Sequence, residues 1–108
     1  MVVLVLLLCV ALYAATLAPG TLFGDPSEYQ FIPAIWGIAH PPGYAFYTLL
    51  AGLWQRIVTV GSVAWRTNLL AACAGAWAAS RVSAIVLSLG ACDRESRAAG
   101  WWPAGSAL

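Results

Sequence analysis

The sequence predicts an all-α, multi-span membrane protein with about three membrane-spanning helices and a surface helix in the loop after the first span. Hydrophobic residues make up 62% of the 108 residues, charged residues only 8%, and the mean hydropathy is +0.83, whereas a soluble domain is about one quarter charged. Apolar runs of near-spanning length recur between turn residues. The net charge of +1 provides no basic surface for nucleic acid, so we expect no nucleic-acid partner.

The first predicted span covers residues 2–18, a nearly unbroken apolar run that Pro19 and Gly20 end. Its length is at the low end for a membrane-spanning helix. A cleaved secretory signal peptide is the alternative, because small residues near the end of the run offer a cleavage site, but no basic residue precedes the run. We therefore expect a retained helix.

Two further spans are predicted at residues 44–60 and 65–89. The run at 44–60 begins with aromatic residues and contains Arg56 near its end, which is typical of the anchors at a membrane interface. Gly61 and Ser62 form a short turn between the two runs. The second and third spans should therefore be neighbours.

Small residues recur at every fourth position of the third run, at Ala71, Gly75, Ala79 and Ser83. They share one helical stripe, which we expect to face another helix at close range. Arg81 lies near the middle of the same run, where an arginine costs about 2.5 to 3.5 kcal/mol on insertion scales. Either Arg81 faces a partner or a wet cavity, or the helix is shifted or ends early and leaves Arg81 at an interface.

Residues 90–108 carry four charged side chains followed by Trp101 and Trp102. This segment is predicted to be a polar loop and the start of a further span. The three cysteines are widely spaced and odd in number, so neither a disulfide framework nor a metal site is predicted from them.

The loop at residues 19–43 gathers three ionisable side chains. It holds Asp25 and Glu28, the only acids in the first ninety residues, and His40, the only histidine. A loop longer than a turn requires often carries function. Locally, Asp25 is predicted to cap a helix, with Pro26 at the first helical position and Glu28 at the third position returning a hydrogen bond to the cap.

The helix that begins there is expected to run to about Ala39. It is too short to cross a membrane and is kinked by Pro33, so we expect it to lie flat on the bilayer surface. The His-Pro-Pro-Gly turn at residues 40–43 returns the chain to the second span. The two acids and His40 then lie close together at one membrane face, and spacing alone leaves a functional and a structural cluster equally open.

Three motifs in a fixed order resemble those of the membrane glycosyltransferases of the GT-C architecture. They are the acidic pair Asp25 and Glu28, the His-Pro-Pro turn that begins at His40, and an Ala-Trp-Arg sequence that ends at Arg66. The resemblance covers roughly residues 10–90 and is greatest to an uncharacterised bacterial family related to protein O-mannosyltransferases. The ordered combination is more specific than any one of its parts.

The resemblance implies transfer of a sugar, with mannose as a candidate, from a polyprenyl-phosphate carrier to an acceptor hydroxyl, with inversion at the sugar carbon. Asp25 and Glu28 are the implied catalytic residues: Asp25 is the general base, and Glu28 positions the acceptor or a metal. His40, Tyr44 and Arg66 are assigned to substrate binding, while structural roles for His40 and Arg66 stay equally open. The cofactor is unknown, and a divalent metal is compatible with this site.

The resemblance also implies a place and partners for the chain. The expected location is the bacterial plasma membrane, with the 19–43 loop extracytoplasmic. The expected partners are membrane lipid and a lipid-linked sugar donor, together with the remaining helices of a larger enzyme. Orientation follows from the resemblance, because the arginines do not favour one side.

The chain departs from that family in three respects. It ends after about three helices, its two acids are separated by Pro26 and Ser27 instead of adjacent, and Arg81 lies in a span that is usually apolar. We therefore expect an amino-terminal fragment that is inactive alone. The alternative is a small non-catalytic membrane protein that binds a partner membrane protein through its loop and its small-residue helix face.

Overall fold

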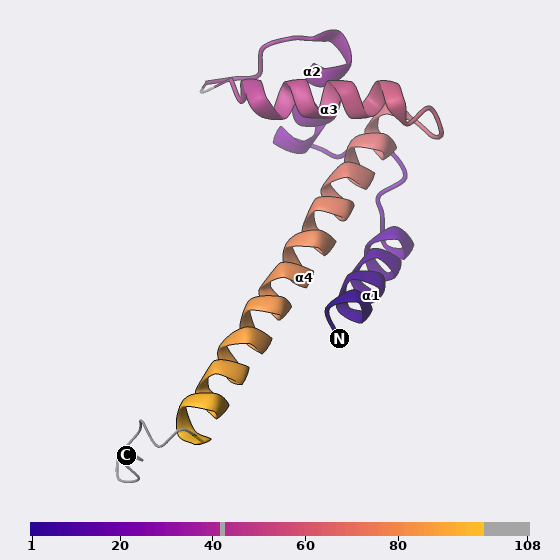
Figure 1. The fold of residues 1–108 in the computed structure, drawn as a ribbon. Coiled ribbons are helices and arrows are strands. Elements are labelled where there is room, and N and C mark those ends of the chain that lie inside the picture. The colour runs from indigo at the N-terminus through magenta and orange to yellow at the C-terminus, as the bar shows by residue number, and fades with distance from the viewer. Residues whose placement is uncertain (42, 99–108) are drawn as a thin grey trace.

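The computed structural model describes residues 1–41 and 43–98, which form four helices and no strand. The helices are α1 (Val2–Ala15), α2 (Asp25–Ile35), α3 (Ala45–Ile57) and α4 (Val63–Ala98). α1 lies antiparallel beside α4, while α2 and α3 pack together across the beginning of α4 (Figure 1). The all-α prediction is confirmed for these residues.

α4 contains the predicted span at 65–89 and is the only helix in the described ranges that is long and apolar enough to cross a membrane. Its 36 residues extend about 54 Å, against about 30 Å of hydrocarbon. The helix continues after Gly90, where a polar loop was predicted, because this segment lacks a helix breaker and Arg97 pairs with Asp93 one turn earlier. The rest of that prediction, at 99–108, lies outside the described residues.

α1 packs on the small residues of α4. A Cβ atom on Gly75 would lie 3.3 Å from the Tyr13 ring, and the nearby Ala76 and Ser80 are fully buried. The prediction that the small-residue stripe faces another helix is therefore confirmed at Gly75, and that helix belongs to the same chain. Arg81 is exposed at the middle of α4, so an early end of the helix is wrong as an explanation for it.

α3 is shorter than the span predicted at 44–60. It begins after Tyr44 and ends where Val58 turns extended, so its 13 residues extend about 20 Å, which is less than a bilayer core. The prediction of about three spans is not confirmed, since α1 is also short, with 14 residues. The structure is better described as α1 packed beside α4, with the short helices α2 and α3 lying across the beginning of α4.

The polarity of α3 is the reverse of a helix on a water-soluble protein. Its buried residues are small or polar: Thr48, Ala51, Gly52 and Gln55. Its exposed residues include large apolar side chains: Phe46, Leu49, Leu50, Leu53 and Ile57. Water favours the opposite arrangement, so this outer face suits an apolar environment.

α2 begins without the predicted capping box. Gly24, at φ 76°, is the N-cap residue, and no side chain caps the helix. Ser27 instead donates its backbone N–H and its hydroxyl to the Gly24 carbonyl. Asp25 is thus the first helical residue and not the cap, because Gly24 supplies a conformation that an aspartate adopts only at a cost.

The end of α2 also differs from the prediction. The helix stops at Ile35 and not near Ala39, because Trp36 adopts a left-handed conformation with φ 54°. The backbone N–H groups of Trp36 and Gly37 both donate to the Ile32 carbonyl, which closes the last turn.

The two short helices cross at a glycine. A Cβ atom on Gly52 would lie 2.7 Å from the Trp36 ring and 2.9 Å from the Pro33 carbonyl oxygen. The Arg56 guanidinium stacks on the Trp36 ring, 4.2 Å from the centre of that ring. Only a residue without a side chain permits this close approach.

Buried amide side chains join the crossing to α4. Gln30 donates to the Asn68 side-chain oxygen (2.7 Å) and accepts from the Leu22 backbone N–H (3.1 Å). Gln55 donates to the Gln30 carbonyl and to the Thr67 hydroxyl. These bonds connect the first loop, both short helices and α4, and they satisfy polar groups that burial would otherwise leave unpaired.

Candidate functional site

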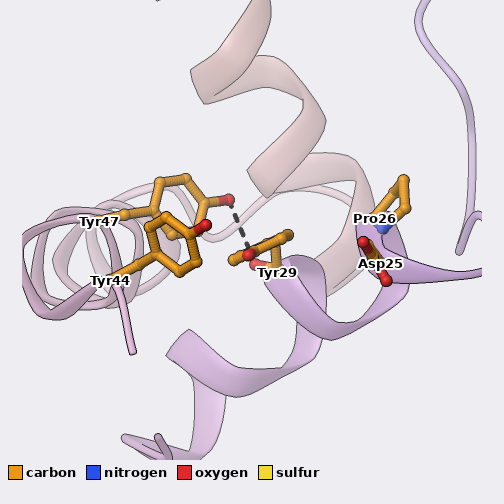
Figure 2. A pocket seen from close by; sticks show the side chains of 5 residues that line it. All are labelled: Asp25, Pro26, Tyr29, Tyr44 and Tyr47. Carbon is orange, nitrogen blue, oxygen red and sulfur yellow. Dashed lines mark hydrogen bonds between the residues drawn. The ribbon is translucent and has the colours of Figure 1, made fainter. Parts of the chain in front are cut away.

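An open pocket of about 470 Å³ lies between the start of α2 and the start of α3. Figure 2 shows Asp25 and Pro26 on one side, Tyr44 and Tyr47 on the other, and Tyr29 between them. The lining is thus aromatic and apolar except for the Asp25 carboxylate and the tyrosine hydroxyls. Such a mixture of apolar surface and few polar groups is typical of small-molecule sites.

The tyrosine rings hold one another edge to face. The Tyr29 ring lies 5.3 Å from the Tyr44 ring and 5.6 Å from the Tyr47 ring, at 82° and 89°. These are favourable geometries for aromatic pairs. They order the three rings along one side of the pocket.

A proline inside α2 anchors Tyr47. Pro33 has no N–H, so the carbonyl of Tyr29, four residues earlier, loses its helical partner. The Tyr47 hydroxyl donates to that carbonyl at 3.2 Å, as the dashed line in Figure 2 marks. The predicted kink residue therefore creates a docking point for a pocket side chain.

Glu28 and His40 form a second polar contact at the edge of the pocket. One oxygen of Glu28 accepts the backbone N–H of His40, and the other lies 2.7 Å from the ring nitrogen Nδ1. The His40 ring lies 5.9 Å from the Tyr29 ring and 6.3 Å from the Tyr44 ring. Both oxygens of Glu28 are therefore engaged by one residue.

The contact changes the acid–base properties of both residues. The hydrogen bonds from His40 lower the pKa of Glu28, and the hydrogen bond and charge of Glu28 raise the pKa of His40. Partial burial, followed by the neighbouring Tyr44 hydroxyl, raises the pKa of Tyr29 to about 12. Around neutral pH the site therefore combines an ionised Glu28 with a neutral Tyr29, and the raised pKa of His40 shifts that residue toward its protonated form.

Four of the five predicted site residues come together. Asp25 and Tyr44 line the pocket, and Glu28 and His40 pair beside it. In the described part of the chain, Asp25 accepts no hydrogen bond from another side chain, so its carboxylate is free to bind a proton or a hydroxyl.

Arg66 lies apart from them, at the opposite end of α3. Its guanidinium donates to backbone carbonyls at 2.7 to 3.3 Å: those of Gln55, Thr59, Val60 and Gly61. These are the carbonyls that a helix end and its turn leave without intrahelical partners. The geometry therefore favours the structural role that the sequence left open, and substrate binding by Arg66 stays a prediction.

The sequence prediction did not include Tyr29 and Tyr47. Their spacing contains a signal, since Tyr29 follows Asp25 by four residues and Tyr47 follows Tyr44 by three, so each pair shares a helix face. Within the described ranges, no three histidine, cysteine or acidic side chains gather as metal ligands. The prediction for Pro42 in the His-Pro-Pro turn falls outside those ranges.

The fold and the pocket define an all-helical region with one candidate membrane-spanning helix and an aromatic pocket beside the beginning of α2. Residues 25–101 match the family model of the protein O-mannosyl-transferase TMEM260 N-terminal domain, so the chain belongs to this family. The matched range contains all five predicted site residues. No solved structure matches the chain.

Two relatives give the same result. The chain is 44% identical over 70 residues to the protein O-mannosyl-transferase TMEM260 of Mus musculus. These residues make up 65% of this chain and 10% of that protein. The chain is 32% identical over 76 residues to the protein O-mannosyl-transferase tmem260 of Dictyostelium discoideum, covering 68% of this chain and 9% of that protein. The chain thus spans about a tenth of the length of these relatives.

Proposed function

We propose that this chain forms the acceptor-activating part of a membrane O-mannosyltransferase of the GT-C architecture. The single observation that carries the proposal is the free Asp25 carboxylate in a tyrosine-lined pocket, within a chain that belongs to an O-mannosyltransferase family. The donor is a polyprenyl-phosphate mannose and the acceptor a hydroxyl group.

In the proposed reaction the acceptor hydroxyl transfers its proton to Asp25. The acceptor oxygen forms a bond to the anomeric carbon while the bond from that carbon to the phosphate oxygen breaks. The electron pair leaves with the polyprenyl phosphate, and the configuration at the anomeric carbon inverts. Asp25 then releases the proton to water through the open side of the pocket, which regenerates the carboxylate.

The proposal includes a position in the membrane. α4 crosses the bilayer, and the reversed polarity of α3 supports a location of α2 and α3 in the extracytoplasmic interface, where one side of the pair meets lipid and the other meets α4. The 19–43 loop then lies in the compartment where the acceptor is modified. A bacterial plasma membrane and a divalent metal stay predictions.

The small-residue face does not favour the alternative of a non-catalytic partner-binding protein. That face is covered by α1 at Gly75, so it is already used within the chain. The remaining helices of a larger enzyme are the proposed partners of the other exposed apolar side chains, which include Val82, Val86 and Leu89.

Replacing the proposed base tests the reaction. Asp25→Asn in the full-length membrane protein removes the proton acceptor while keeping the size and shape of the side chain. We expect sugar transfer from a polyprenyl-phosphate mannose donor to fall by at least about 100-fold, the low end for loss of general acid–base catalysis. Asp93→Asn is the control, since Asp93 is exposed near the far end of α4. Unchanged transfer by Asp25→Asn would reject the proposal.

A further inference from the structure

Glu28 is held by His40 through both of its carboxylate oxygens. Each of its two oxygens meets one group of His40 at 2.7 Å: the backbone N–H and ring nitrogen Nδ1. Charge-assisted bonds of this length are among the stronger hydrogen bonds in proteins. Together the two bonds fix the orientation of the Glu28 carboxylate against His40.

The bond to the backbone N–H of His40 acts on the turn that precedes α3. The Gly43 N–H donates to the His40 carbonyl at 2.9 Å, and Gly43 has φ 87°. Holding His40 by its backbone therefore fixes the entrance of this turn on α2. α2 thus determines where the chain enters α3.

The next residue, Tyr44, has an unfavourable backbone. Its φ and ψ are both 45°, in the left-handed region, which is unfavourable for a residue with a side chain. Such conformations persist where the surroundings hold them, and they cluster at functional sites. Here the surroundings are the turn on one side and the rings of Tyr29 and His40, which both contact Tyr44 edge-on.

We infer that Glu28 and His40 are positioning residues, which hold the Tyr44 ring as an aromatic wall of the pocket on the side opposite Asp25. This inference rests on the proposed function in assigning the occupant: a pyranose ring, whose C–H face can lie on the aromatic wall while its hydroxyls reach the Asp25 carboxylate. Glu28 then acts through His40 and Tyr44 and touches neither substrate.

The charge state of the pair links this wall to pH. Glu28 faces His40 directly, Asp25 adds a weaker charge, and the rings of Tyr29 and Tyr44 lie beside the His40 ring. Because the folded pKa of His40 is raised, the stabilisation by its charge is complete below the ordinary value and is lost as the pH rises through the raised value. Because the folded pKa of Glu28 is lowered, its contribution is lost only in acid.

The test compares two substitutions in the full-length membrane protein. Glu28→Gln keeps an oxygen for the His40 N–H but loses the charge, whereas Glu28→Ala loses both. With polyprenyl-phosphate mannose as the varied substrate, we expect Glu28→Ala to raise KM about tenfold or more, which corresponds to about 1.4 kcal/mol, and Glu28→Gln to restore most of it. kcat should change little in Glu28→Gln. Because the His40 charge is lost as the pH rises, KM should rise in alkaline solution, and this rise should begin at a lower pH in Glu28→Gln than in the parent protein.

A second measurement does not depend on activity. Hydrogen–deuterium exchange of residues 40–47 should accelerate in Glu28→Ala and stay near the parent rate in Asp25→Asn and in Glu95→Ala, an exposed control on α4. Loss of kcat in Glu28→Gln as complete as in Asp25→Asn, or unchanged exchange and KM in Glu28→Ala, would overturn the positioning role. Retained transfer in Asp25→Asn would instead reject the proposed base and leave the exchange result to decide the role of Glu28.

Discussion

The two halves of the molecule, α1 with α4 and α2 with α3, are each held in place by different forces. α1 and α4 meet through small and apolar side chains, with Gly75, Ala76 and Ser80 at the contact. α2 and α3 are joined to each other and to α4 by side-chain hydrogen bonds, most of them from Gln30, Gln55 and Arg66. Helix contacts in lipid rely on close packing, whereas short elements at an interface need specific polar bonds. The pocket lies in the half with polar bonds.

The largest expected effect concerns the side of the membrane on which each end of α3 lies. Cysteines introduced as Ala45→Cys and Thr59→Cys, at exposed positions near the two ends of α3, should both react with a membrane-impermeant maleimide from the same side of sealed vesicles. Exposed Cys92 on α4, kept alone in a separate variant, should react from the other side. Reaction of the two introduced cysteines from opposite sides would restore α3 as a span and remove the distinction between the halves.

An intermediate effect is expected at the helix crossing. Gly52→Ala places a Cβ atom within 3 Å of the Trp36 ring and the Pro33 carbonyl, so we expect the free energy of unfolding to fall by about 1 to 3 kcal/mol. Gly90→Ala is the matched control, because its Cβ meets nothing within 4 Å and gains up to about 1 kcal/mol of helix propensity. Denaturant unfolding in detergent micelles measures both, and equal effects would show that the crossing tolerates a side chain.

The smallest effect tests the bond that Pro33 makes necessary. Tyr47→Phe removes the hydroxyl that satisfies the Tyr29 carbonyl and should lower the free energy of unfolding by about 1 kcal/mol. In a Pro33→Ala background the new backbone N–H can serve that carbonyl, so the same change should cost much less. A double-mutant cycle gives the coupling, and additive effects would mean that the two residues act independently.

The sequence predicted the parts of this structure that depend on local pattern. The apolar runs of α1 and α4, the start of a helix near Asp25 and the proximity of Asp25, Glu28 and His40 follow from composition and spacing. α3 was read as a span because aromatic and leucine side chains suit a helix lying along an interface as well as one crossing it. Its length is decided by the backbone at Tyr44 and Val58, which no composition reveals.

The contacts of the polar residues were harder to predict. Glu28 has the spacing of a capping box, but His40 competes for its carboxylate with two donors once the turn returns to α2. Arg66 has no local partner in the sequence, and its role arises only because the end of α3 brings free carbonyls to it. Both outcomes depend on tertiary structure, which spacing along one chain does not contain.

Gln30 gives the polar half a property that none of its helices has separately. Through its side chain and its carbonyl this residue bonds to Leu22, Asn68 and Gln55, which lie in three different segments. None of these segments can leave its place without breaking a bond to the same residue, so the half should open as one cooperative unit. The amide proton of Leu22, in an irregular segment, should then exchange with solvent as slowly as those inside the neighbouring helices.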